Sequence, residues 1–533
     1  MSTTFDVINP ATEKLVVSLH EADVAQTDEI IAKAAKAFLT WKKVSPGDRA
    51  NLLRRFSAIV TAHREELAQL EITNSGHTRG NALWEADNVA NVLNYYAGAP
   101  ERLFGKQIPV AGGVDITFKE PIGVVGIIVP WNFPMPIASW GFAAALAAGN
   151  TVVLKPAELT PMTAVRLAEL ALVAGIPEGV LNVIVGKGSV VGARFVTNPT
   201  VRKISFTGST PVGKSIMAGC ADQVKRVTLE LGGKSANLIF ADSDVDHAAA
   251  AAPGAVFDNS GQDCCARSRI LVQKSIFDRF MAGFEKSVKE YRVEDPNLDS
   301  SQMGPLVSKK QLETVQSYLN DKDDTVAFTG TAPSGAGYWM PPTVLLPKSV
   351  NARTWQEEIF GPVLSIITYK DEEEALKIAN NTIYGLGGAV WSNDYDRAMQ
   401  FARHMRTGQV DINGAPFNTL APFGGYKQSG NGREYGLYGF KEWNKHTIDS
   451  WKIKPSQSVS EALIIEQWDE ILRFIVTIKL KESTASDIFR RLNSYSKQHR
   501  LYQALKGFGQ IIKTDFILRY LDDIDLRQAI EKQ

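Results

Sequence analysis

Ile122-Gly-Val-Val-Gly-Ile-Ile-Val-Pro130 opens the part of the chain that decides the fold. It is a short run rich in β-branched residues, and an apolar segment with helical composition follows it. The alternation continues along the chain: strands are predicted at 123–129, 151–154, 181–185 and 203–206, and helices at 136–148 and 163–174. Strands that alternate with helices predict a parallel sheet covered by helices, as in nucleotide-binding folds.

The regions on either side extend this picture. Residues 27–96 have apolar positions at helical spacing, such as Leu52, Phe56 and Val60, and no glycine-rich loop. We therefore expect a helical scaffold there. Residues 270–440 repeat the strand–helix alternation and predict a second α/β domain.

Composition excludes several functional classes. The 533 residues are enough for several domains, and Lys+Arg and Asp+Glu are both 58, so no net field attracts nucleic acid or an anionic membrane. Three cysteines, two of them adjacent, offer no disulfide framework, and the N-terminus lacks the pattern of a signal peptide. Prolines interrupt the most apolar region, at 122–148. We expect a soluble cytoplasmic protein with no metal, membrane or nucleic-acid partner.

Polar residues follow the predicted strands, at the edge where parallel sheets bind ligands. Trp131-Asn132 follows the first strand, Lys155 and Glu158 follow the second, and Gly208-Ser209 follows another. Gly208 suits a tight turn, and N–H groups at the helix start beyond it favour a pyrophosphate, although Ser209 is equally explained as a plain helix cap. Lys155 and Glu158 are either a surface ion pair or contacts to an adenosine ribose. An acidic residue there would repel a 2′-phosphate and so favours NAD over NADP.

Two further stretches carry reactive side chains. Glu230 is a carboxylate in an apolar strand followed by two glycines. It is either a solvated edge residue or a buried base whose pKa is raised toward neutrality. The stretch Phe257–Arg267 places Cys264 and Cys265 among small and polar residues, which suits a thiol that a substrate must reach; inert buried thiols are the alternative.

Taken together, seven motifs closely resemble the aldehyde dehydrogenase superfamily. The resemblance extends from about residue 8 to about residue 453. The motifs, in chain order, are Pro130-Trp-Asn-Phe-Pro134, Phe206-Thr-Gly-Ser209, Glu230-Leu-Gly-Gly-Lys234, Gly261-Gln-Asp-Cys264, Glu358-Ile-Phe-Gly-Pro362, Pro422-Phe-Gly-Gly425 and Gly432-Arg-Glu434.

This resemblance implies a reaction. Cys264 matches the nucleophile, and Asn132 matches the side-chain donor of an oxyanion hole that the N–H of Cys264 completes. The thiolate would attack an aldehyde, and loss of hydride to the nicotinamide would leave a thioester. Glu230 matches the general base for hydrolysis, which favours the carboxylic acid over acyl transfer to coenzyme A. Glu434 matches a carboxylate that relays the proton outward.

The resemblance also implies a cofactor and a domain organisation. The matched NAD contacts are Trp131, Lys155, Glu158, Gly208, Ser209, Glu358 and Phe360. A Rossmann-like NAD-binding domain would comprise 1–108 and 122–231, and an α/β catalytic domain would comprise 232–435. A small oligomerisation β-sheet would come from 109–121 and 436–455, with strands near 110–119 and 445–453. Such proteins are homodimers or homotetramers.

The substrate is less determined than the reaction. Phe133, Ile137, Trp140 and Phe423 are expected to line a substrate tunnel, which favours apolar or aromatic aldehydes. Asp263, beside the nucleophile, instead suits an aminoaldehyde, and a semialdehyde is a further alternative substrate. Its charge would also raise the pKa of Cys264 unless solvent screens it, and a solvated surface aspartate is the alternative.

The chain departs from this family after about residue 455. Residues 456–533 have helical spacing, with Thr484 as a helix cap, and resemble part of the transposase of replicative bacterial transposons. We infer that a transposon insertion extended the reading frame, and we expect this helical extension to be a passenger. The alternative, a DNA-associated protein that acts through its tail, is disfavoured by the neutral charge.

Overall fold

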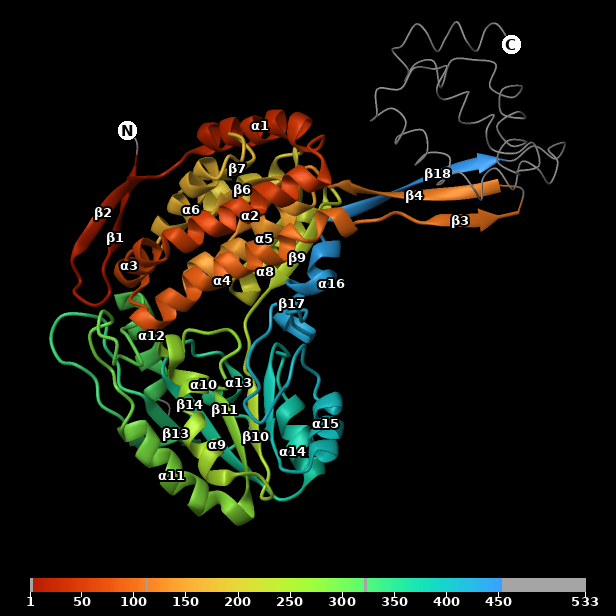
Figure 1. Ribbon diagram of the computed structural model, residues 1–533. Helices are drawn as coiled ribbons and strands as arrows, with labels where there is room; N and C mark the ends of the chain where they lie inside the picture. Colours follow the sequence, from red (N-terminus) through yellow and green to blue (C-terminus); the bar gives the residue numbers. More distant parts are fainter. Residues whose placement is uncertain (1–2, 112, 321–323, 453–533) are drawn as a thin grey trace, which may run out of the picture. The chain divides into compact units, whose positions relative to one another are not determined.

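The computed structural model describes residues 3–111, 113–320 and 324–452, and the helical extension predicted at 456–533 lies outside them. The chain divides into two units (Figure 1). Of the described residues, those at 3–104 and 118–447 belong to the first unit, and those at 105–117 and 448–452 belong to the second.

The first unit contains a six-stranded sheet with the order β17-β9-β8-β5-β6-β7. Its strands β5 to β9 are parallel, and β17 pairs antiparallel with β9. Every residue of β5 and β6 is buried, as expected for parallel strands covered on both faces. The four strands predicted between 123 and 206 are confirmed. The strands are β5 (Val124–Ile128), β6 (Thr151–Lys155), β7 (Leu181–Val183), β8 (Val201–Thr207), β9 (Arg226–Glu230) and β17 (Gly430–Asn431).

Helices cover this sheet, and the helical scaffold predicted at 27–96 is confirmed. Asp23, Ser45 and Thr78 each cap a helix by accepting a backbone N–H bond. The second and fourth helices pack on α5, the apolar helix that follows β5 (Figure 1). The helices are α1 (Val24–Trp41), α2 (Pro46–Ala62), α3 (Arg64–Ser75), α4 (Arg79–Ala97), α5 (Pro134–Ala147), α6 (Met162–Val173), α7 (Ala193–Thr197) and α8 (Thr210–Ala221), and a hairpin of β1 (Thr4–Ile8) and β2 (Leu15–His20) precedes them.

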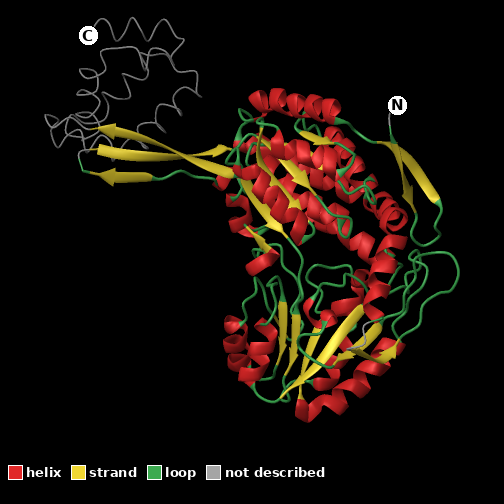
Figure 2. Ribbon diagram, turned by 180° about the vertical axis from the view of Figure 1, so that it is seen from behind, coloured by secondary structure: helices red, strands yellow, loops and turns green. Residues whose placement is uncertain are grey.

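A second sheet, of seven strands, confirms the predicted second α/β region (Figure 2). Its order is β12-β13-β14-β11-β10-β15-β16, and all neighbours are parallel except β12 and β13. The strands are β10 (Ala236–Ile239), β11 (Arg269–Gln273), β12 (Asp324–Thr329), β13 (Thr343–Pro347), β14 (Val363–Tyr369), β15 (Gly388–Trp391) and β16 (Asp411–Ile412). The helices are α9 (Val245–Ala251), α10 (Gly254–Phe257), α11 (Phe277–Lys289), α12 (Lys309–Leu319), α13 (Arg353–Gln356), α14 (Glu372–Asn380) and α15 (Tyr395–His404).

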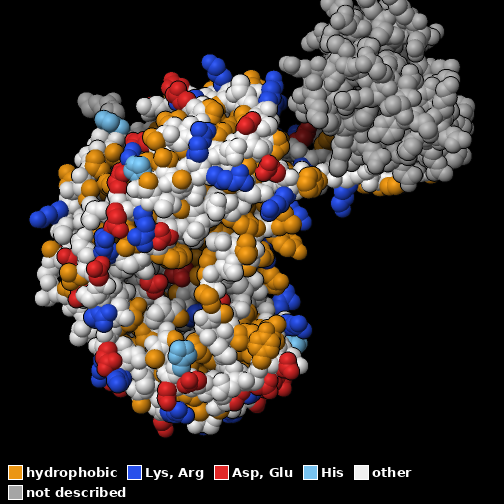
Figure 3. Space-filling model, in the orientation of Figure 1, with side chains coloured by type: hydrophobic (Ala, Val, Ile, Leu, Met, Phe, Trp, Pro, Cys, Tyr) orange, Lys and Arg blue, Asp and Glu red, His pale blue; other side chains and the backbone are white. Residues whose placement is uncertain are grey.

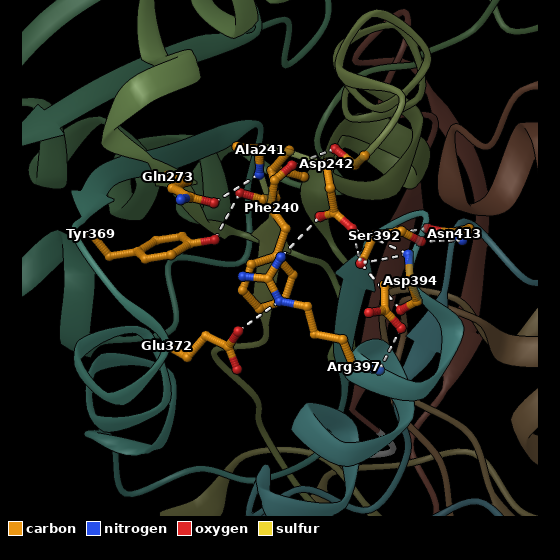
Figure 4. Close-up of polar contacts among 12 residues, drawn as sticks. Phe240, Ala241, Asp242, Gln273, Tyr369, Glu372, Ser392, Asp394, Arg397 and Asn413 are labelled. Carbon is orange, nitrogen blue, oxygen red and sulfur yellow. Dashed lines mark hydrogen bonds and ion pairs between the residues drawn. The ribbon is translucent and has the colours of Figure 1, made fainter.

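The carboxyl end of this second sheet is closed by a hydrogen-bonded network (Figure 4). Asp242, just after β10, accepts bonds from Ser392 Oγ at 2.7 Å and from Arg397 Nη1 at 3.2 Å. Arg397 also donates to Glu372 at 2.6 Å and lies 3.9 Å from the centre of the Phe240 ring. Open α/β sheets usually bind ligands at this end. Here protein side chains occupy it, whereas Cys264 lies just before β11, at the opposite, amino end of the sheet.

The third sheet contains strands of the predicted oligomerisation region. Its order is β18-β4-β3, and β3 and β4 form an antiparallel hairpin. The strands are β3 (Gln107–Val110), β4 (Gly113–Pro121) and β18 (Asn444–Lys452), preceded by α16 (Gly436–Lys441). A sheet near 110–119 and 445–453 is therefore confirmed, whereas its role in assembly stays a prediction.

The surface agrees with the neutral composition. On the face shown in Figure 3, basic and acidic side chains are intermixed and form no field of a single sign. Within the described ranges, no helix is both long and apolar enough to cross a bilayer.

Candidate active site

The loop before β11 has an unusual backbone. Asn259, Ser260 and Gly261 are consecutive and left-handed, with φ of 48°, 57° and 72°. Left-handed residues other than glycine are strained, and such strain concentrates at functional sites. At Gly261 a Cβ atom would overlap the carbonyl oxygen of Gly361, so only glycine fits. This turn carries the chain from α10 to Cys264.

Cys264 and its neighbours form a compact polar group. Asp263, Cys264 and Cys265 are partly buried, and their ligand atoms lie within 4.8 Å of one another. Cys265 donates to Asp263 through its backbone N–H at 3.0 Å and through its Sγ at 3.2 Å. The contact with the Cys265 thiol, burial and the charge of Asp263 raise the pKa of Cys264 well above its ordinary value.

Asn132 lies beside this loop, although 130 residues separate it from Gln262. Its Nδ2 donates to the carbonyl oxygen of Gln262 at 2.9 Å, and its own carbonyl accepts from Asn259 Nδ2 at 2.6 Å. The two bonds join the loop after β5 to the loop before β11. They hold a buried amide donor two residues from the thiol-bearing position.

Glu230 ends β9 and is 2% exposed. Neither of its carboxylate oxygens has a hydrogen-bond partner in the part of the chain that the structure describes. Burial, followed by the charge of Glu434, raises its pKa well above the ordinary value, which is the property required of a base near neutrality. The buried reading of Glu230 is therefore correct, and the solvated-edge reading is wrong.

Glu434 is also buried, and it lies on the segment that pairs with Phe423. Its Oε1 accepts a bond from Ser205 Oγ at 3.0 Å, and its Oε2 has no partner among the described residues. Burial raises its pKa to about 7, and Lys203 and Ser205 oppose that rise.

At the edge of the first sheet, Lys155 and Glu158 form a directed pair. Lys155 is 2% exposed and donates to Glu158 Oε2 at 3.1 Å and to the carbonyl oxygen of Pro156 at 2.9 Å. Glu158 Oε1 accepts the N–H of Gly188 at 2.9 Å. The pair is therefore not an ordinary surface ion pair, because both side chains of a surface pair are solvated and Lys155 is buried.

The turn after β8 presents a helix start. The N–H of Gly208 donates to the carbonyl of Glu230 at 3.0 Å, which ties the turn to β9. Ser209 is the N-cap of α8, but its side chain makes no capping bond. The hydroxyl is therefore unused as a cap at the start of a helix of 12 residues, where an anion is favoured.

Glu358 and Phe360 face this region from the second sheet. Glu358 Oε1 accepts the N–H of Gly233 at 2.9 Å, and burial raises its pKa to about 7. Phe360 is left-handed, with φ of 58°, and its ring meets that of Trp131 edge-on at 5.1 Å. Trp131, just after β5, and Phe360, just before β14, are therefore in contact.

The predicted tunnel residues Trp140 and Phe423 form one aromatic cluster, with ring centres 5.4 Å apart. The sequence reading missed two members of it: Phe417 lies 6.4 Å and Tyr435 4.5 Å from Trp140. The two cysteines pack against the same hydrophobic core as this cluster, and so does Ile137.

Phe133 lies in a second aromatic group. Its ring centre is 5.8 Å from His77 and 6.4 Å from Trp84. Trp84 is on α4 and is 46% exposed. The sequence predicts only a helical scaffold in this region and singles out neither Trp84 nor His77, which lies just before α4. A large aromatic side chain that stays half exposed on an otherwise packed helix is the structural sign that indicates a ligand-binding surface.

Comparisons with known proteins agree with this geometry. The family model described as "Aldehyde dehydrogenase family" matches residues 1–448, and the "Tn3 transposase DDE domain" matches 432–533, which confirms the expected likeness of the tail. The chain is 41% identical over 451 residues to an aldehyde dehydrogenase of Emericella nidulans, covering 83% of this chain and 90% of that protein.

Two further relatives are informative about cofactor and substrate. Aminoaldehyde dehydrogenase 2 of Pisum sativum is 41% identical over 82% of this chain and 90% of its own length. A crystal structure of Staphylococcus aureus betaine aldehyde dehydrogenase in complex with NAD+ matches with a TM-score of 0.83 at 36% identity. That match covers 86% of this chain and 93% of the other.

Proposed function

The chain belongs to the aldehyde dehydrogenase family, and from this we propose that it oxidises an aldehyde to the carboxylic acid with NAD. One observation carries the proposal most directly. Hydrogen bonds join the loop of the Cys264 thiol to the loop of the buried amide donor Asn132. Glu230, a buried carboxylate without a partner among the described residues, ends the strand that leads to Gly233, and Gly233 packs closely on the carbonyl of Cys264. A structural relative without this activity would have no use for that set. We further propose that residues 1–108 with 122–231 form the NAD-binding domain and that residues 232–435 form the catalytic domain. Residues 109–121 with 436–455 would form the oligomerisation region.

The chemistry assigned to these residues is covalent. Cys264 Sγ, as the thiolate, attacks the aldehyde carbon, and the oxygen that becomes negative accepts bonds from Asn132 Nδ2 and the N–H of Cys264. After hydride loss the acyl group remains on Cys264 as a thioester. Glu230 takes a proton from water, the resulting hydroxide attacks the thioester, and the acid leaves.

Replacing Asn132 by Ala should lower kcat by roughly 10²–10³-fold, the usual cost of removing one oxyanion donor. Binding of the aldehyde should change much less, because the charge develops only during reaction. Steady-state rates measure the loss. Alkylation of Cys264 by iodoacetamide is the control, because it forms no oxyanion. An equal loss in both would indicate a displaced loop instead of a lost donor.

The residues around the cofactor edge fit NAD. Glu158 presents a carboxylate that suits ribose hydroxyls and disfavours a 2′-phosphate, and the start of α8 suits a pyrophosphate. Trp131, Lys155, Gly208, Glu358 and Phe360 would complete the binding residues. Bound NAD supplies the hydride acceptor for the oxidation.

Two substrate classes suit the aromatic residues. Phe133, Ile137, Trp140 and Phe423 favour an apolar or aromatic aldehyde through burial of its carbon atoms. The same rings would also attract a cationic aldehyde by cation–π interaction, and Asp263 adds a negative charge beside the thiol. The name of the Pisum sativum relative makes an aminoaldehyde the principal alternative, followed by a semialdehyde.

Asp263→Asn should lower the pKa of Cys264, because a negative charge near the thiol disfavours the thiolate. The rate of Cys264 alkylation should then rise at lower pH than in the native protein. An aminoaldehyde should lose more kcat/KM than an aromatic aldehyde if Asp263 recognises the cation. Asp299→Asn is the matched control. It makes the same substitution at an exposed carboxylate that pairs with Arg79 and not with the cysteines.

The test of the proposed function is NADH formation with aliphatic, aromatic, ω-amino and semialdehyde substrates, each with NAD and with NADP. Turnover of at least one aldehyde with NAD, and its loss in Cys264→Ala, is the expected result. Folded protein that binds NAD but oxidises none of them would contradict the proposal.

A further inference from the structure

A line of polar side chains crosses the first sheet beside Glu230. Lys203 and Ser205 are two apart on β8, and Thr228 and Glu230 are two apart on β9. In the parallel register Ser205 is opposite Thr228, so the four side chains point to one face. Their exposed fractions are 0%, 5%, 1% and 2%. The residues between them, Ile204, Phe206 and Leu229, pack in an apolar core.

Two carboxylates of the segment 434–442 face this line. Glu434 accepts the bond from Ser205, and Glu442 Oε2 lies 3.9 Å from Lys203 Nζ. Lys203 also donates to Thr228 Oγ1. The side chain of Glu442 is 37% exposed, whereas that of Lys203 is wholly buried. The line therefore begins at a buried carboxylate and ends at one that solvent reaches.

The atoms along the line are able to exchange protons. Both oxygens of Glu230 and one of Glu434 lack a partner among the described residues, and a buried polar atom without a protein partner normally bonds an ordered water. Burial lowers the pKa of Lys203 to about 8, close to the value of about 7 for Glu434. The charged groups that act on Lys203 are Glu442, Glu434 and Arg226.

We propose that Lys203 carries the proton taken up by Glu230 out of the active site, receiving it from Glu434 and releasing it to Glu442. The inference rests on the proposed function and extends it. The proton on Glu230 passes to Glu434, whose carboxyl O–H then protonates the neutral amine of Lys203. The ammonium donates to Glu442, which releases the proton to water, and every group returns to its starting charge.

A static counter-ion is the competing explanation for Lys203. Its ammonium would then neutralise Glu434 and Glu442, supported by the ring of Trp443 at 4.8 Å. The two explanations differ in what arginine should do. A guanidinium keeps the charge and the donors but does not lose its proton in proteins. Lys203→Arg should therefore restore a counter-ion but not a proton carrier.

The experiment uses a chromogenic ester, p-nitrophenyl acetate, because it acylates Cys264 without cofactor. Nitrophenolate released in the first turnover reports acylation, and the later steady rate reports hydrolysis of the thioester. Lys203→Met should keep the first-turnover amplitude and lower the steady rate by about tenfold or more. Such a loss approaches the one expected when a side chain positioned for proton transfer is removed. Lys203→Arg should be equally slow, and added imidazole should partly restore both rates.

The matched control is Lys225→Met. Lys225 is also buried, and its Nζ donates to the carbonyl oxygens of Phe195 and Asn198 at 2.8 and 2.6 Å. Among the described residues, Lys225 makes no hydrogen bond or ion pair with Glu434 or Glu442. The variant should lose stability, measured by thermal unfolding, while keeping the steady rate per folded molecule.

The outcomes separate the two proposals. Native protein that gives no nitrophenolate release dependent on Cys264 would contradict the proposed function itself. A normal first turnover with an unchanged steady rate in Lys203→Met, or full recovery in Lys203→Arg, would overturn only the proton path. Glu442→Gln should show a smaller loss than Lys203→Met, because water can replace a half-exposed acceptor.

Discussion

Cys264→Ala should abolish aldehyde oxidation, with a loss of roughly 10⁶-fold, the scale seen when a covalent nucleophile is removed. The proposed reaction passes through a covalent bond to the Cys264 thiol, which follows the left-handed turn at residues 259–261. Binding of NAD, measured by calorimetry, should persist, because the cofactor residues lie on other loops.

The controls for this variant are the other cysteines. Cys220→Ala removes a thiol buried in α8 and should leave turnover unchanged. Cys265→Ala should keep turnover and lower the pKa of Cys264, because the contact with the Cys265 thiol is the largest contribution to its rise. Retained oxidation in Cys264→Ala, or its loss only in Cys265→Ala, would assign the nucleophile to the neighbouring residue.

Glu230→Gln should separate the two halves of the reaction. Without the base, hydrolysis of the thioester should slow by about 10²–10⁴-fold, whereas the first equivalent of NADH should still form. Rapid mixing with aldehyde and NAD measures both phases in one trace. In the native protein the steady rate should rise with pH as Glu230 and Cys264 lose their protons, because both have raised pKa values.

The direction of this pH effect follows from the active forms. Glu230 acts as the carboxylate and Cys264 as the thiolate. Because both pKa values are raised, the steady rate should increase at a higher pH than it would for groups with ordinary pKa values. Glu230→Gln should remove the contribution of the carboxylate and leave only that of the thiol. A rate that falls with rising pH, or a variant with no first-turnover NADH, would contradict these roles.

Local sequence signals predicted the parts of the fold that depend on local chemistry. Runs of β-branched residues such as 122–129 became buried parallel strands, because only a sheet covered on both faces accommodates them. The caps at Asp23, Ser45 and Thr78 begin helices in the segment predicted as helical. The motifs then predicted that Asn132 lies near the loop of Cys264, and the bond from Asn132 to Gln262 agrees with this although 130 residues separate the two.

What remained unpredicted depends on tertiary neighbours. Nothing near Trp84, on α4, or His77, just before it, indicates in the sequence that these side chains would pack against Phe133. The bonds from Cys265 to Asp263 follow a left-handed turn that asparagine tolerates at residue 259 but that no preference of serine specifies at residue 260. The sequence predicts Lys203 only as the start of a strand, because its partners Thr228, Glu442 and Trp443 lie farther along the chain.

The most direct test of the account is mass spectrometry of Glu230→Gln after brief incubation with NAD and an aldehyde that the native protein oxidises. We predict a mass increase equal to one acyl group, and fragmentation of the peptide that contains residues 257–267 should place it on Cys264. The adduct should not form without NAD, because oxidation must precede the thioester. An acyl group on Cys265, or oxidation with no adduct on either cysteine, would contradict a mechanism through Cys264.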